Sequence, residues 1–267
     1  MTQPDMRSIE VAGIPVGYFV QGEGPEIVLV HGAGGHPESS FTNLLEHLAQ
    51  SRTVIVPGYS GSSFTPLPEE KLTFELLTEQ ILGVIRAAAR GPVDIIGFST
   101  GAVIAGVAAA KEPELVRRLI SCGGFLHYRQ PRQRMFVRTW LRLADADANA
   151  FADYTVMHAL SDRYLDSISA AERFQIRIGL MPTTGLVALC HLVNDMDVTE
   201  YWQNITSPAL VIAPKEDHLV PIRYARQLHD TIPGSEYVEI DSGHLVPVEK
   251  PAELLKIIDE FFAQPTP

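Results

Sequence analysis

A serine flanked by glycines carries the strongest chemical signal in the sequence. It stands in Gly97-Phe98-Ser99-Thr100-Gly101, between the apolar run 93–96 and an Ala- and Val-rich run that begins at Val103. A serine placed between a strand and a helix requires a tight turn, and glycines two residues before and after it remove side chains that would collide there. The turn would expose the Ser99 hydroxyl beside a helix N-terminus, which stabilises negative charge. The pattern therefore favours a nucleophilic serine, with a glycine-rich structural turn as the alternative.

A serine hydroxyl is a weak nucleophile at neutral pH, so this hypothesis requires a base. Among the nine histidines, His244 stands in the loop after the last predicted strand, in Asp241-Ser242-Gly243-His244. A carboxylate must then orient the imidazole and stabilise its charged form. Asp217 follows another predicted strand and is the preferred candidate, with its neighbour Glu216 as the rival. The chain order serine, aspartate, histidine is that of hydrolytic triads on doubly wound sheets.

Acyl chemistry also needs N–H donors for a developing oxyanion. The amide of Thr100 is one predicted donor, and the amide of Ala33, in His31-Gly32-Ala33-Gly34-Gly35, is the other. A flexible glycine loop is the alternative. Phosphate binding is disfavoured, because the loop matches neither GxxxxGK[ST] nor GxGxxG. The predicted substrate-binding residues are His31 in this loop, His36 just after it and Tyr59 in the loop that follows 53–56.

Alternating strands and helices must position these residues. Short runs rich in Val and Ile predict strands, and the later runs are continuously apolar, as in parallel sheets covered on both faces. The predicted strands are 16–20, 27–30, 53–56, 93–96, 119–121, 210–213 and 237–240. Apolar spacing near 3.6 residues or an Ala-rich composition predicts helices at 41–49, 74–89, 99–111 and 251–262.

The alternation of strands and helices is interrupted once, between residues 125 and 205. This stretch contains no convincing strand, only helical pieces at 127–142, 144–160, 170–180 and 184–193. A long helical insertion between two core strands predicts a lid over one end of the sheet, and a helical subdomain with only a packing role is the alternative. We expect a core domain formed by 1–124 and 206–267, with 125–205 as a helical cap.

These motifs together resemble the α/β-hydrolase fold superfamily over nearly the whole chain. The resemblance rests on the loop 31–35, the serine turn 97–101, and the segments ALVIAPKEDHLVP (209–221) and SGHLVPVEKP (242–251). The last two are similar to the lidded esterase, enol-lactonase and cofactor-free haloperoxidase-like branch. The resemblance implies an eight-stranded, mostly parallel sheet flanked by helices, with a helical cap inserted after the sixth strand. It also implies a triad of Ser99, His244 and Asp217, and an oxyanion hole at the Ala33 and Thr100 amides.

Composition narrows the classes of partner. The chain has 21 Lys and Arg against 32 Asp and Glu, a formal charge of −11, which disfavours a nucleic-acid binder. Cys122 and Cys190 lie outside any zinc-ligand spacing and are predicted to be small buried side chains. Segment 1–10 lacks the apolar run of a signal peptide, and no run reaches the length of a membrane span. We expect a cytoplasmic monomer or homodimer that acts on a small molecule without a membrane partner.

The leading hypothesis is a serine hydrolase that cleaves a small or medium-sized carboxylic ester, lactone or thioester through an acyl-enzyme on Ser99. This chemistry requires no metal and no organic cofactor. One alternative is an acyltransferase, cyclase or C–C bond hydrolase with the same triad. Another is a small-molecule receptor without catalysis, since fold does not determine function.

Overall fold

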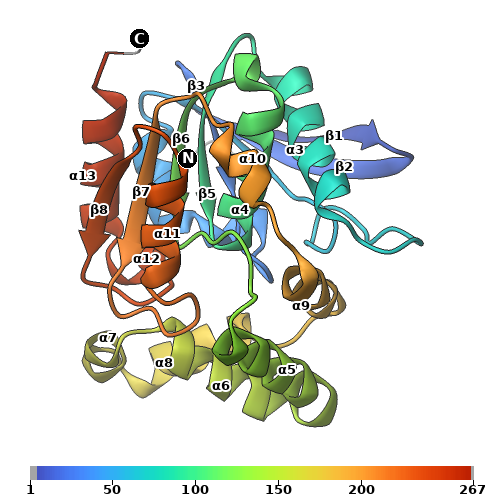
Figure 1. The fold of residues 1–267 in the computed structure, drawn as a ribbon, viewed down its shortest axis with the longest axis vertical. Helices are drawn as coiled ribbons and strands as arrows, with labels where there is room; N and C mark the ends of the chain where they lie inside the picture. The colour runs from blue at the N-terminus through green and yellow to red at the C-terminus, as the bar shows by residue number, and fades with distance from the viewer. Residues whose placement is uncertain (1–4, 266–267) are drawn as a thin grey trace.

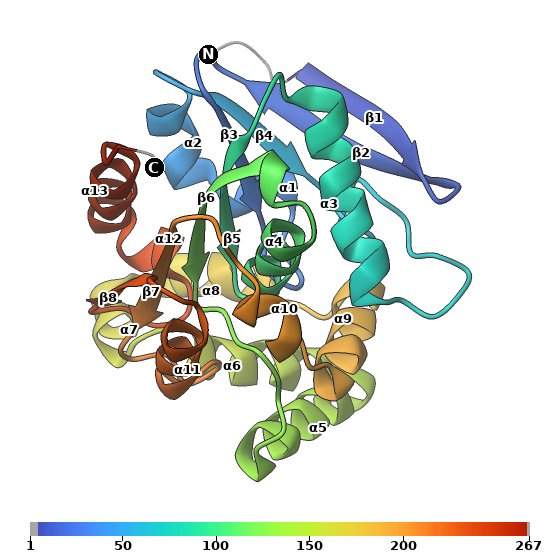
Figure 2. The same cartoon turned by 45° about the horizontal axis from the view of Figure 1, so that its top comes forward.

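One eight-stranded sheet runs through the molecule in the computed structural model, which describes residues 5–265 (Figures 1 and 2). The spatial order is β1-β2-β4-β3-β5-β6-β7-β8, with β2 antiparallel to both β1 and β4 and the other pairs parallel. The expected eight-stranded, mostly parallel sheet is therefore confirmed. The strands are β1 Asp5–Val11, β2 Ile14–Gln21, β3 Glu26–Val30, β4 Thr53–Pro57, β5 Val93–Phe98, β6 Val116–Cys122, β7 Ala209–Pro214 and β8 Glu236–Ile240.

Helices cover both faces of the sheet, which is why its central strands are continuously apolar. Successive side chains of a strand point to opposite faces. In β3, Val28 and Val30 belong to one hydrophobic cluster, whereas Ile27 and Leu29 belong to the other. The first cluster is closed by α3 Phe74–Ala88, α4 Thr100–Lys111 and α11 Arg223–Thr231, and the second by α2 Thr42–Leu48, α12 Val246–Glu249 and α13 Pro251–Phe262.

A group of helices inserted between β6 and β7 lies together beyond one end of the sheet, as Figures 1 and 2 show. These helices are α5 Pro131–Ala146, α6 Ala148–Ala159, α7 Asp162–Ser167, α8 Ala170–Gly179 and α9 Thr184–Asp195, and we call them the cap. The short α10, Thr199–Gln203, packs instead against α4, where the ring of Trp202 lies over Gly106. The last helix of the insertion, α10, therefore packs as part of the core.

Several predicted boundaries are wrong for identifiable reasons. The helix predicted at 127–142 begins at Pro131, because a proline is favoured in the first helical turn. The helix predicted over 144–160 is broken at Asp147, whose carboxylate accepts hydrogen bonds from the amides of Asn149 and Ala150 and so begins α6. The elements α1 Pro37–Ser40, α7, α10, α11, α12 and a 3-10 turn at Pro113–Leu115 were not predicted.

The first strand was also not predicted. β1 pairs only with β2, and most of its residues are exposed, so it lacks the apolar pattern of the central strands. Residues 1–4 of the segment in which we expect no signal peptide lie outside the described residues.

A buried ion cluster fixes the end of β5 that lies away from the cap. The Asp94 side chain is fully buried and accepts hydrogen bonds from Arg52 (2.9 Å), Arg117 (2.9 Å) and Arg118 (3.0 Å). Arg118 also donates to the carbonyl of Phe262 in α13, so the cluster joins the sheet to the C-terminal helix. Burial by itself would raise the pKa of Asp94, but the hydrogen bonds and charges of Arg117 and Arg118 outweigh it and hold this pKa below its ordinary value.

Replacing Asp94 by asparagine is expected to lower the free energy of unfolding by about 3 kcal/mol, because three guanidinium groups lose their shared buried counter-charge. A depressed carboxyl pKa stabilises the fold above the unfolded-state pKa, and that contribution disappears as the pH falls through the folded-state pKa. The wild type should therefore lose stability more steeply than Asp94→Asn below about pH 4. Urea unfolding at several pH values measures both effects.

Asp259→Asn provides the matched control, because Asp259 pairs with His47 on the surface with both side chains about half exposed. Exposed pairs contribute little to stability, so the control should unfold like the wild type. Equal unfolding midpoints for Asp94→Asn and the control would contradict the assignment of Asp94 as a structural ion centre.

Candidate active site

Ser99 occupies a strained turn between β5 and α4. Its φ of 54° and ψ of −123° are unusual for a residue with a side chain, and its amide donates to the carbonyl of Cys122 at 2.9 Å. A Cβ atom on Gly97 would collide with Ala102, and one on Gly101 would collide with the carbonyls of Val30 and His31. The two glycines therefore permit the turn, as the sequence predicts. Backbone strain of this kind costs about 1–3 kcal/mol and is typical of functional sites.

His244 and Asp217 meet at the carboxyl end of the sheet, in the loops after β8 and β7. The Nδ1 atom of His244 donates to Oδ2 of Asp217 at 2.6 Å, and both side chains are almost completely buried. The other carboxylate oxygen accepts from the amides of Leu219 (2.9 Å) and Val220 (2.6 Å), which fixes its orientation. Glu216, the rival candidate, points to the surface and pairs with Arg163 at 3.2 Å.

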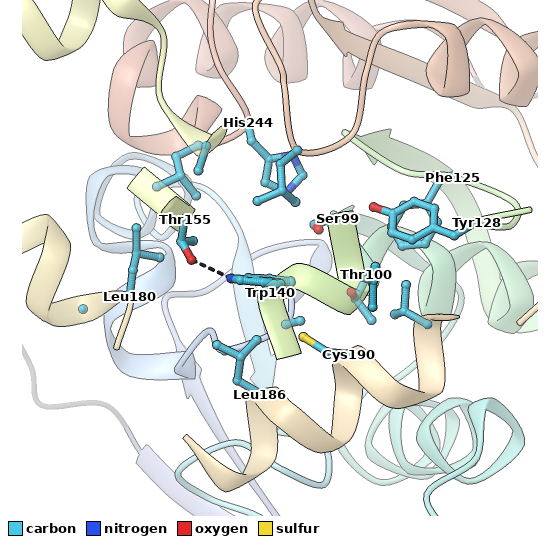
Figure 3. A pocket seen from close by; sticks show the side chains of 18 residues that line it. Ser99, Thr100, Phe125, Tyr128, Trp140, Thr155, Leu180, Leu186, Cys190 and His244 are labelled. Atoms are coloured by element: carbon cyan, nitrogen blue, oxygen red, sulfur yellow. Dashed lines mark hydrogen bonds between the residues drawn. The ribbon is translucent and has the colours of Figure 1, made fainter. Parts of the chain in front are cut away.

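Ser99 and His244 line one cavity, which lies between the end of the sheet and the cap. Figure 3 shows Ser99 and His244 among the side chains that line this cavity, together with the aromatic residues Phe125, Tyr128 and Trp140. This inner chamber has a volume of about 70 Å³, and its walls are mostly apolar. Ala33 and Thr100 lie on its wall together with residues from the cap, which include Val137, Trp140, Thr155, Ala159, Leu186, Cys190 and Val193.

A larger outer chamber, of about 470 Å³, adjoins the inner one around Ser99 and His244. Ser99, His244, Ala33 and Leu180 line both chambers. Exposed side chains such as Ser39 and Ile178 border the outer chamber, so it opens to solvent. His36 lies on this outer wall, and its role in substrate binding stays a prediction.

His31 and Tyr59 lie beneath the Gly32–Gly35 loop instead of on either chamber wall. The Tyr59 hydroxyl donates to the carbonyl of His31 at 2.9 Å, and the two rings stack with centroids 4.2 Å apart. Both residues are buried, and burial lowers the pKa of His31 to about 4, so its ring is neutral at pH 7. The structure thus places these two predicted substrate-binding residues as supports of the loop, because their large rings fill the space under it.

The loop after β3 brings Ala33 to the serine turn. Gly35 donates from its amide to the carbonyl of Gly32 at 3.0 Å, which closes the loop. A Cβ atom on Gly32 would lie 3.0 Å from Cβ of Ser99, so the glycine allows the loop to approach Ser99 closely. Thr100 is the first residue of α4, where helix amides have no intrahelical acceptor.

The cap residues that face Ser99 are the part of the site that sequence reasoning missed. Trp140 forms one wall, and its Nε1 donates to Thr155 Oγ1 at 2.6 Å, the bond drawn in Figure 3.

Cys190 is buried and free, as is Cys122, which confirms the prediction for both cysteines. Among residues 5–265, no group of three His, Cys, Asp or Glu side chains is arranged to hold a metal ion.

Similarity to a known protein family extends over most of the chain. A family model described as alpha/beta hydrolase fold matches residues 25–251. The chain belongs to the α/β-hydrolase family.

In the described chain no single helix is long and apolar enough to cross a membrane, although the bent pair α8–α9 would pass that test together.

Relatives of this α/β hydrolase carry several activities. It is 31% identical over 261 residues to the pyrrolizixenacetamide deacetylase of Xenorhabdus hominickii, with 96% of this chain and 97% of that protein covered. It is 27% identical over 274 residues to the 2-hydroxymuconate semialdehyde hydrolase of Pseudomonas putida, with coverage of 97% and 94%. The enol-lactonase of Burkholderia xenovorans LB400 shares the fold, with a TM-score of 0.87, 22% identity and coverage of 97% and 100%. The protein is thus a hydrolase of the α/β family.

Proposed function

We propose that this hydrolase is a serine esterase that cleaves a small or medium-sized carboxylic ester, lactone or thioester through an acyl-enzyme on Ser99. The observation that carries the proposal is that Ser99 lines the same cavity as His244, whose ring is held by Asp217 at 2.6 Å. Nucleophile, base and orienting carboxylate come from three distant loops, which is the arrangement that hydroxyl activation requires.

The chemistry proceeds in two halves. Ser99 Oγ attacks the substrate carbonyl while its proton passes to Nε2 of His244, and the Ala33 and Thr100 amides stabilise the oxyanion. His244 then returns that proton to the leaving alcohol or thiol, and the acyl group stays on Ser99. A water molecule next gives its proton to His244 and attacks the acyl carbonyl. The same proton returns to Ser99, and the carboxylic acid leaves.

The two chambers suggest how the substrate is divided. The acyl group remains on Ser99 while the leaving group departs and water enters, so the leaving group belongs in the chamber that opens to solvent. The inner chamber then receives the acyl chain. Its volume of about 70 Å³ is roughly half of the ~150 Å³ cavity that holds a benzene molecule. This size favours short acyl groups of about two to four carbons.

A fluorophosphonate probe, which phosphonylates activated serines, tests the proposal directly. The native protein should be labelled at Ser99, as located by peptide mass spectrometry, and heat-denatured protein should not be labelled. Absence of labelling in the native protein, together with no turnover of acetate or butyrate esters, would refute the esterase assignment and favour a receptor.

Cleavage of a short-chain amide is the second candidate, because a 31% identical relative is a deacetylase and because the inner chamber is small. Comparing p-nitrophenyl acetate with p-nitroacetanilide, which carry the same acyl group, separates the two activities.

Acyl transfer, cyclisation and C–C bond cleavage would use the same triad. Product analysis with and without an added alcohol or thiol identifies transfer.

A further inference from the structure

One carboxylate joins the loop that carries His244 to the cap. Glu249 ends α12, which begins two residues after His244, and its side chain folds back over that loop. The Gly243 amide donates to Oε2 of Glu249 at 3.1 Å. Glu249 therefore holds the residue immediately before the predicted base.

The same carboxylate accepts two hydrogen bonds from the cap. Ser161 donates to Oε1 from its amide at 2.9 Å and to Oε2 from its hydroxyl at 2.6 Å. The Ser161 hydroxyl also accepts from the amide of Tyr164 and so caps α7. One half-buried carboxylate thus accepts three hydrogen bonds from two segments far apart in the sequence. Hydrogen bonds to a charged group are stronger than neutral ones.

Backbone contacts around this carboxylate also hold the His244 loop closely against the end of α6. The Leu245 amide donates to the carbonyl of Ala159, and the His218 amide donates to the carbonyl of His158, both at 3.2 Å. A Cβ atom on Gly243 would lie 2.6 Å from Oε1 of Glu249 and 2.7 Å from the Ala159 carbonyl. The end of α6 therefore contacts the residues on both sides of His244 and the residue after Asp217.

We propose that Glu249 is a positioning residue that couples the cap to His244. It holds the His244 loop against the segment 158–161, so that the imidazole stays on Asp217 while Thr155 and Ala159 form the wall of the inner chamber. The proposal rests on the proposed function, in that His244 acts on Ser99. Movement of the cap and alignment of the base are then one event, because the same carboxylate binds both.

Glu249→Gln tests the coupling with almost no change in size. The amide group supplies one acceptor oxygen where the carboxylate supplies two, so Ser161 and Gly243 cannot all keep their hydrogen bonds. We expect kcat for a short-chain ester to fall by up to about 100-fold, the loss typical of a 1 Å misplacement, while KM changes little. Glu253→Gln is the matched control, because Glu253, the third residue of α13, is exposed. This variant should retain wild-type kcat.

A spectroscopic readout separates this proposal from the esterase assignment and from a general loss of stability. The proton between His244 and Asp217 should give a low-field proton NMR signal in the wild type and in Glu253→Gln. In Glu249→Gln that signal should shift or broaden, although the circular dichroism spectrum stays that of the folded protein. This experiment needs no substrate, so it succeeds or fails independently of ester turnover.

Ser161→Ala provides a second variant that changes the cap alone. It removes one of the three hydrogen bonds to Glu249 and touches neither His244 nor Ser99, so kcat and the low-field signal should change in the same direction as in Glu249→Gln, by less. The proposal is overturned if both variants keep the wild-type low-field signal, or if their only effect is a higher KM.

Discussion

Replacing Ser99 by alanine is expected to lower kcat/KM for a short-chain ester by about 10⁴- to 10⁶-fold, because the proposed nucleophile, base and carboxylate would act as a unit. The variant should fold, since alanine can follow the same turn with one atom fewer. Rates of p-nitrophenyl acetate hydrolysis, measured on protein purified free of other esterases, give the comparison. Electrospray mass spectrometry should detect an acetylated wild type and an unmodified variant.

Ser121→Ala is the control for this prediction. Ser121 lies buried in β6, the strand beside β5, and its hydroxyl has no hydrogen-bond partner within the described residues. Loss of that hydroxyl should leave turnover unchanged. If Ser99→Ala kept the wild-type rate, or if acetyl groups were found on another residue, Ser99 would not be the nucleophile.

The parts of the site that could be predicted from sequence are those imposed by the backbone. Gly97 and Gly101 are required because any Cβ atom there would collide with neighbouring main chain. His244 and Asp217 follow strands, and the carboxyl ends of parallel strands meet at one edge of a sheet. Local chain geometry therefore predicted their proximity, and the structure joins them by a hydrogen bond of 2.6 Å.

The parts that could not be predicted depend on which way side chains point in the packed molecule. Tyr59 stands in a loop near the site, but its ring packs under His31, where no periodic pattern indicates a direction. Glu249 had no visible role because its partner, Ser161, is 88 residues away. The exposed strand β1 lies at the sheet edge and pairs only with β2. That pairing, more than the composition of the segment, makes it a strand.

Replacing Trp140 by phenylalanine is expected to shift the preferred acyl chain of the enzyme upward by about two carbons. The indole forms one wall of the inner chamber, and phenylalanine has three fewer side-chain atoms, so the freed space extends a cavity of only about 70 Å³. One methylene in an apolar pocket changes specificity by about 10- to 200-fold. The ratio of kcat/KM for hexanoyl to acetyl p-nitrophenyl esters should therefore rise at least tenfold in the variant.

Trp202→Phe removes the same atoms from a site away from the chambers, and it separates a change in cavity shape from a change in stability. Trp202 is fully buried between α10 and α4, so its replacement should lower the melting temperature without changing chain-length preference. Trp140→Phe also loses the hydrogen bond from the indole to Thr155, but Thr155 keeps its bond to the Phe151 carbonyl and so stays in the chamber wall. If both variants preferred the same chain length as the wild type, the acyl group would not lie against Trp140. The outer chamber would then have to hold it, and the short-acyl assignment would be lost while the role of Ser99 remained.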